Sequence, residues 1–147
     1  MDLEIEQIYS EILKEHTNSS RNKHHIDHPT ITKKGINPSC GDEIELELSI
    51  DQGVITDAGF TGCGCAISQA SSSIMIDLIK GKPVKEALHL TEMFIGMIKK
   101  EITNEEELEM LEDAIALKDI SHMPARVKCA VLSWHTLRES MKDEEKL

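Results

Sequence analysis

The residues of this chain best suited to chemistry are its four cysteines, Cys40, Cys63, Cys65 and Cys129. A thiolate is both a nucleophile and a ligand for zinc or iron. We expect these thiols to stay reduced, as metal ligands, nucleophiles or buried core residues, rather than to form a disulfide framework. Cys63 and Cys65 flank one glycine, and three alternatives are open for them: a redox pair, two ligands of one metal, or one ligand beside a bystander.

Two of the cysteines lie where the backbone favours a negative charge. In the stretch NPSCGDE, Gly41 permits a tight turn, so that Cys40 and Asp42 can converge on one point. Cys65 lies where a predicted strand gives way to a helix, whose free amide groups stabilise a thiolate. Both positions suit either a metal ligand or a nucleophile.

Cys129 lies near the start of the last predicted helix, just after Arg126 and Lys128, in a locally basic setting. Three thiolates and one carboxylate are enough donors for a tetrahedral zinc site. Such a site carries a net negative charge, which Arg126 and Lys128 are candidates to offset. The alternatives are that the cysteines are small buried core residues and that both cations are ordinary surface charges.

The composition argues against some classes of partner. The formal net charge is -11, from 16 basic and 27 acidic residues, so the clustered Lys and Arg of a nucleic-acid surface are not expected. No apolar run approaches the ~20 residues of a membrane span, and the acidic N-terminus lacks the pattern of a secretory signal. We therefore expect a cytoplasmic protein with no nucleic-acid or membrane partner.

Hydrophobic periodicity predicts a helix, then strands, then a run of helices, which is typical of an α+β domain. We expect a small antiparallel β-sheet of about three strands with helices packed on one face, and a single domain over 1–147 with a mobile tail at about 142–147. The predicted helices cover 2–16, 65–81, 83–98, part of 103–118, and 124–141, and the predicted strands cover 30–36, 43–50 and 54–61.

The alternation of residues in the second and third strands predicts which face of the sheet is buried. Isoleucine and leucine at the even positions of 43–50 alternate with glutamate and serine, so we expect one buried face and one face in water. In 54–61 the same alternation puts Ala58 and Phe60 on one face and Ile55 on the other. Cys63 then shares the face of Asp57, and we expect it near solvent.

Three stretches, NPSCGDEIELEL, GCGCAISQASSSIM and MPARVKCAVLSW, resemble the cysteine signatures of the iron-sulfur cluster assembly proteins of the IscU and NifU N-terminal domain family. The likeness runs from about the first helix to Trp134. The chain is most similar to the SufU branch, because Lys128 stands where scaffold members have a histidine before the last cysteine. The acidic stretch 101–121 also corresponds to an insertion typical of that branch.

The resemblance implies a SufU/IscU-like fold and a zinc-dependent sulfurtransferase that accepts persulfide sulfur from a SufS-type cysteine desulfurase. The implied zinc ligands are Cys40, Asp42, Cys65 and Cys129, and the implied sulfur acceptor is Cys40. Downstream iron-sulfur assembly proteins would then receive the sulfur. The alternative is a scaffold that binds iron or a [2Fe-2S] cluster and transfers it, and a third possibility is a structural zinc module that bridges proteins.

Other polar residues are assigned no role in this chemistry. Cys63 is expected outside the metal site, with a resolving thiol for a persulfide as the alternative. Solvent-facing or partner-facing positions are expected for His24, His25 and His28, and surface or helix-packing positions for His122 and His135. Ser71, Ser72 and Ser73 have no general base nearby in the sequence, which argues against a hydrolase.

Overall fold

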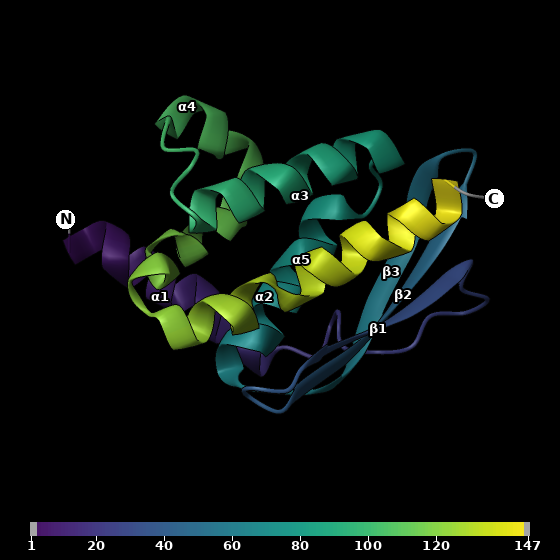
Figure 1. Cartoon of the computed structure of the whole chain (residues 1–147), viewed down its shortest axis with the longest axis horizontal. Helices are drawn as coiled ribbons and strands as arrows, with labels where there is room; N and C mark the ends of the chain where they lie inside the picture. The colour runs from purple at the N-terminus through teal and green to yellow at the C-terminus, as the bar shows by residue number, and fades with distance from the viewer. Residues whose placement is uncertain (1–2, 146–147) are drawn as a thin grey trace.

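The computed structural model describes residues 3–145 and confirms the predicted α+β fold, in which helices cover one face of an antiparallel sheet with the strand order β1-β2-β3 (Figure 1). The elements, in chain order, are α1 (Leu3–Asn18), β1 (Ile31–Asn37), β2 (Asp42–Asp51), β3 (Val54–Cys63), α2 (Ala66–Ile79), α3 (Val84–Ile98), α4 (Glu105–Leu108), the 3-10 helix η1 (Glu109–His122) and α5 (Pro124–Glu145). Among the described residues, no helix combines the length and apolar character that a membrane span requires.

β2 and β3 form the expected hairpin. Its two-residue turn consists of Gln52 and Gly53, which both have positive φ, at 49° and 76°, as suits the twist of two antiparallel strands. On the covered face of the sheet, Ile44, Leu46 and Leu48 are fully buried. α5 packs across this face against β1 and β2, and α2 lies beside α5 and contacts β3 (Figure 1).

The register of β3 differs from simple alternation. Ser49 pairs with Asp57 and Ile50 pairs with Ile55, so Thr56 has no partner of its own and forms a bulge. A one-residue insertion moves the side chains before it to the opposite face. Ile55 therefore joins Ala58 and Phe60 in the core, and the prediction that Ile55 faces the other way is wrong.

The sequence predicts that the outer face of the sheet is in water, but part of the chain covers it in the structure. The segment between α1 and β1 crosses it, with the amide of Phe60 donating to the carbonyl oxygen of Asn22. Glu47, which is only 5% exposed, binds the imidazole of His25 at 2.6 Å and accepts a hydrogen bond from the amide of Ile26. His25 is thus a partner of Glu47 within the chain.

The acidic segment does not form the single helix predicted within 103–118. Asn104 caps α4, its side chain accepting hydrogen bonds from the amides of Glu106 and Glu107, but α4 ends at Leu108. The 3-10 helix η1 follows, interrupted at Glu112, whose φ of 51° and ψ of -126° are not helical.

A period of three residues explains why η1 is not an α-helix. A 3-10 helix has three residues per turn, so positions three apart lie on one face. All but one of the buried apolar side chains in this region, Ala116 being the exception, follow that spacing: Leu108, Leu111, Ala114, Leu117 and Ile120. After the interruption at Glu112, the 3-10 conformation buries Ala114, Leu117 and Ile120 together, whereas an α-helix would rotate the later ones away from the core.

The helical layer is centred on Trp134 of α5, which is fully buried. Its indole stacks on the ring of Phe94 of α3, with ring centroids 4.0 Å apart and the planes 8° from parallel. The indole nitrogen donates to the hydroxyl of Ser71 on α2, which in turn donates to the carbonyl oxygen of Ala130. One side chain therefore ties α2, α3 and α5 together.

α5 continues to Glu145, past the predicted helix end at residue 141, and residues 146–147 of the tail lie outside the described residues.

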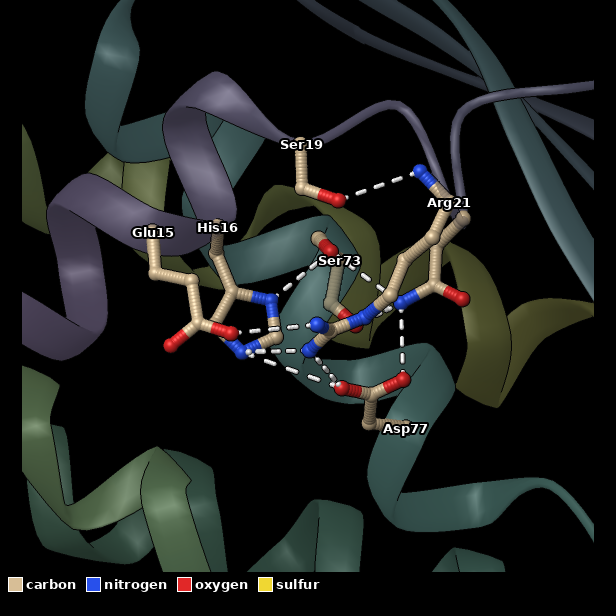
Figure 2. A network of polar contacts seen from close by, with 7 residues as sticks. Glu15, His16, Ser19, Arg21, Ser73 and Asp77 are labelled. Atoms are coloured by element: carbon tan, nitrogen blue, oxygen red, sulfur yellow. Dashed lines mark hydrogen bonds and ion pairs between the residues drawn. The ribbon is translucent and has the colours of Figure 1, made fainter.

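A polar network joins the end of α1 to α2 (Figure 2). The imidazole of His16 lies 2.8 Å from the hydroxyl of Ser73, and both side chains are almost completely buried. Arg21 reaches across from the following loop to pair with Asp77 at 2.5 Å, and Asn22 donates to Asp77 and to the backbone of Ser73. These contacts fix the first helix against α2.

Candidate metal centre

The turn between β1 and β2 presents Cys40. The amides of Cys40 and Gly41 donate to the carbonyl oxygen of Asn37, at 3.3 and 3.0 Å. Gly41 has a φ of 73°, in the left-handed region that glycine adopts without strain. The thiol of Cys40 is exposed and lies 3.8 Å from the carbonyl oxygen of Ala125, near the start of α5.

Asp42, the first residue of β2, is fully buried. Its Oδ1 accepts a 2.9 Å hydrogen bond from the amide of Cys65, the residue before α2. Gly64 permits this approach, because a Cβ there would lie 2.6 Å from Oδ1. Oδ2 is buried with no hydrogen-bond partner in the part of the chain that the structure describes. Leaving such an acceptor unsatisfied costs about 1–3 kcal/mol or more, so a ligand at this oxygen would stabilise the fold.

Cys129 reaches the same point from α5. Its side chain is 1% exposed, and its sulfur lies 3.3 Å from the sulfur of Cys40. The sulfurs of Cys40 and Cys129 and a carboxylate oxygen of Asp42 all lie within 4.8 Å of one another. Burial, followed by the contacts with Cys40 and Asp42, raises the pKa of the Cys129 thiol above its usual range. A bound divalent cation would favour the thiolate instead.

Cys65 lies beside this group without joining it. Its amide holds Asp42, but its sulfur is not among the donor atoms that share the 4.8 Å cluster. The side chain is half-buried and contributes to the raised pKa of Cys129, so it faces the same region. The structure therefore brings three of the four predicted ligands together and leaves the fourth adjacent to them.

Of the two cations considered as charge partners, Arg126 is the one at the site. The negative charge that Cys65 can carry, together with hydrogen bonds to Cys129 and Cys65, raises the pKa of the Arg126 guanidinium. Lys128 is exposed and lines a shallow hollow with Ile36 and His135. Arg126 is thus positioned to offset negative charge on the sulfurs.

The donors present fit a zinc ion. Two sulfurs and a carboxylate oxygen converge, one buried carboxylate oxygen has no other partner, and a third sulfur is adjacent. Thiolates with one carboxylate are ligands that zinc accepts in a four-coordinate site, and iron accepts the same sulfur donors. The ligands would come from the β1–β2 turn, the start of α2 and the start of α5.

Cys63 lies on the other face of the sheet. It pairs with Glu43, the residue after Asp42, and neighbouring residues of a strand point to opposite faces. Its thiol is exposed, as expected, and borders a hollow formed with Glu43, Glu45 and Gly62.

A second set of donors, His25, Glu45 and Glu47, also lies within 4.8 Å, on the outer face of the sheet. The hydrogen bond between His25 and Glu47 accounts for the geometry of this second set, because it fastens the segment between α1 and β1 to β2. His122 is exposed at the end of η1, and His135 is half-buried against Arg138, at 2.7 Å. Among the described residues, neither is part of the donor group around Cys129.

The structure places a histidine, a possible general base, next to a serine, and the sequence does not reveal this pairing. His16 lies against Ser73 and its Nε2 is 3.7 Å from Asp77, although 57 positions separate the histidine from the serine (Figure 2). Ser73 and His16 are 1% and 3% exposed, so a substrate has no access to the hydroxyl. The arrangement is a structural contact between α1 and α2.

Known proteins are similar to this chain in sequence and in fold. A family model described as the NifU-like N terminal domain matches residues 8–145. An iron-sulfur cluster assembly scaffold protein IscU of Thermotoga maritima is 41% identical over 138 residues, which are 94% of this chain and 95% of that protein. The zinc-dependent sulfurtransferase SufU of Bacillus subtilis is 37% identical over 142 residues, 96% of this chain and 94% of that protein.

Solved structures of related proteins have a similar fold. A crystal structure described as an iron-sulfur cluster assembly scaffold protein for the SUF system, from Fervidobacterium islandicum, has a TM-score of 0.85 and 35% sequence identity, covering 92% of this chain and 97% of that one. The N-terminal NifU-like protein of Brucella abortus has a TM-score of 0.83 at 21% identity, covering 97% of each chain, and shares the fold.

Proposed function

Because this chain belongs to the NifU-like N-terminal domain family, with IscU and SufU proteins of iron-sulfur cluster assembly as relatives, we propose that it is a zinc-dependent sulfurtransferase. It would accept persulfide sulfur from a cysteine desulfurase of the SufS type and pass it to downstream assembly proteins. The observation that carries this proposal is the graded exposure of the clustered donors. Cys40 is exposed, whereas Cys129 and Asp42 are buried.

That gradient supports different roles for the donors. A sulfur atom delivered by a partner protein reaches Cys40 first, because its thiol lies on a surface turn. Cys129 and Asp42 are held by α5 and β2 and cannot turn outward without unpacking the core. Cys40 is thus the acceptor, and Asp42, Cys65 and Cys129 would hold zinc with it. Bound zinc supplies a stable thiolate state and structural order, with no redox chemistry of its own.

The transfer is a thiol exchange. The Cys40 thiolate attacks the terminal sulfur of the persulfide on the desulfurase, forming a new sulfur–sulfur bond. The old sulfur–sulfur bond breaks, and the donor cysteine leaves as a thiolate that takes up a proton from solvent. The sulfane sulfur moves without net oxidation or reduction. Arg126, beside the sulfurs of Cys65 and Cys129, offsets the negative charge that the site holds during this exchange.

A scaffold for a [2Fe-2S] cluster is the second candidate. The same sulfurs suit iron, and the Thermotoga relative is named as a scaffold. The residue before Cys129 is less favourable to this function, because Lys128 is a cation that cannot ligate iron without losing its proton.

The test is desulfurase turnover, measured as alanine released from cysteine, with and without this protein. We expect zinc at one equivalent and stimulated turnover for the wild type, no stimulation for Cys40→Ser, and wild-type stimulation for the control Cys63→Ser. Stimulation that survives in Cys40→Ser would show that Cys40 is not the acceptor. An anaerobic titration with iron and sulfide distinguishes the second candidate, since a stable coloured cluster without stimulation favours a scaffold.

A further inference from the structure

One buried residue contacts several parts of the cysteine site without being a ligand. Asn37 ends β1 and is 6% exposed. Its carbonyl oxygen accepts the hydrogen bonds that form the turn of Cys40, and it pairs directly with Asp42 across the β1–β2 register. Its side-chain amide nitrogen lies 4.0 Å from the sulfur of Cys129, the long end of the range for an N–H donor to sulfur.

The packing of β1 on α5 explains how Asn37 reaches Cys129. Gly35 lies two residues earlier on the same face of β1, where a Cβ would clash with the side chain of Thr136 and lie 3.3 Å from Leu132. The missing side chain lets β1 approach α5 closely. Cys129, Leu132 and Thr136 follow one another at helical spacing along that side of α5, so the next inward residue of β1 meets Cys129.

The backbone of Asn37 is also restricted. Pro38 follows it, and a residue before proline is held in an extended conformation by contact with the proline ring. Because side chains alternate along an extended strand, Asn37 points to the same side as Gly35, toward α5, and its carbonyl oxygen faces the turn. One residue thereby couples the position of the exposed cysteine to that of the buried one.

We propose that Asn37 is a positioning residue of the cysteine site, whose side-chain amide donates to the sulfur of Cys129 while its carbonyl oxygen fixes the turn that carries Cys40. A donor aimed at a sulfur stabilises a thiolate and its bond to a metal, because hydrogen bonds to charged acceptors are the stronger ones. Cys40, Asp42 and Cys65, which contact Cys129, are sources of negative charge, and the Asn37 amide adds a neutral donor to the cationic one that Arg126 supplies. The inference rests on the proposed zinc site.

Two substitutions separate the amide from the shape of the side chain. Asn37→Leu keeps nearly the same size and removes the donor, and Asn37→Asp also places a carboxylate beside the sulfur. Both keep the backbone carbonyl that forms the Cys40 turn. The matched control is Asn22→Leu, because Asn22 is equally buried but donates to Ser73 and Asp77 on α2.

The measurements are zinc affinity, by competition with a chromogenic chelator, and the absorption spectrum of the cobalt-substituted protein. We expect Asn37→Leu to weaken zinc binding several-fold and Asn37→Asp by ten-fold or more. The sulfur-to-cobalt charge-transfer bands should shift in both. Asn22→Leu should lower the melting temperature and leave the affinity and the spectrum at wild-type values. A loss of folding stability alone does not move the spectrum of the protein that remains folded.

Wild-type affinity and spectrum in both Asn37 variants would overturn the inference and leave the proposed function intact. A change of the same size in Asn22→Leu would also overturn it, because the effect would then follow from general destabilisation. If Asn37→Leu does not fold, Asn37→Asp decides the matter on the same two measurements. Wild-type protein that binds no zinc would overturn the proposed function and this inference with it.

Discussion

The sulfur of Cys129 lies 3.3 Å from the sulfur of Cys40, although 89 positions separate the two residues in the chain. The carboxylate of Asp42 lies within 4.8 Å of both. Three groups that can each carry a negative charge repel one another at such distances unless protons or a cation lie between them. The fold brings them together at the meeting point of β1, β2 and α5, so a metal bound there would stabilise the folded chain.

Metal removal should therefore lower the melting temperature. Zinc that binds only the folded chain stabilises it by about 2.7 kcal/mol at a free concentration of 100 times the dissociation constant. We expect chelation to reverse that gain, as measured by circular dichroism during heating. Cys63→Ser should keep the full zinc-dependent shift, because Cys63 lies on the other face of the sheet. Cys129→Ser should lose most of it, and an unchanged shift in that variant would exclude Cys129 as a ligand.

Asp42→Asn should weaken zinc binding while keeping the fold. The remaining amide oxygen can still accept the hydrogen bond from the amide of Cys65, but the buried Oδ2 becomes an NH₂ group that cannot ligate a metal. We expect at least a ten-fold loss in zinc affinity by chelator competition. Asp51→Asn, at the exposed far end of β2, is the control and should bind as the wild type does. Equal affinities would remove Asp42 from the ligand set.

Gly64→Ala should disturb the same carboxylate by contact. The added Cβ would lie 2.6 Å from Oδ1 of Asp42 and 3.2 Å from the hydroxyl of Ser68, so the carboxylate must move. We expect weaker zinc binding. The control is Gly53→Ala, in the distant hairpin turn, where φ is 76° and no atom lies within 4 Å. That control should cost about 1 kcal/mol of stability from the left-handed backbone and leave zinc affinity unchanged.

Acid should destabilise the junction of α1 and α2 through His16. Burial lowers the pKa of the His16 imidazole below its ordinary value, and Asp77, the second-largest influence, acts in the opposite direction. The unfolded chain then takes up the proton first, so the stability contributed by neutral His16 is present above about pH 6.5 and declines as the pH falls below it.

Urea unfolding at pH 7.5 and pH 5.5 checks this dependence. His16→Asn retains an acceptor toward Ser73 and removes the titration, so its stability should change less between the two pH values than that of the wild type. His89→Asn, an exposed position on α3, should behave as the wild type does. An identical pH dependence in His16→Asn would show that His16 does not titrate in this range.

The sequence by itself determined the α+β class and the order of the elements, because hydrophobic periodicity reflects which side of each segment is buried. It also placed Cys40, Asp42 and Cys129 as candidate ligands, since their motifs resemble those of a known family. Cys63 was set apart from them by strand alternation. These inferences depend on local spacing, which the sequence displays directly.

Local spacing did not predict the face of Ile55 or the conformation of η1. The bulge at Thr56 exists because β3 must match the register of β2, and register is a property of two strands together. The 3-10 helix forms because a period of three buries Leu111, Ala114 and Leu117 against α3 and the other helices. In both cases packing outweighs the local preference of the segment.

Only the tertiary structure decided how the site is built. It showed that Cys65 stands beside the donor cluster, that Arg126 lies beside the sulfurs, and that Asn37 contacts Cys129 across 92 positions. The contact of Asn37 depends on how closely β1 approaches α5, which the absence of a side chain at Gly35 permits. The sequence lists the residues, whereas the distances between them arise from the packing of elements that are far apart in the chain.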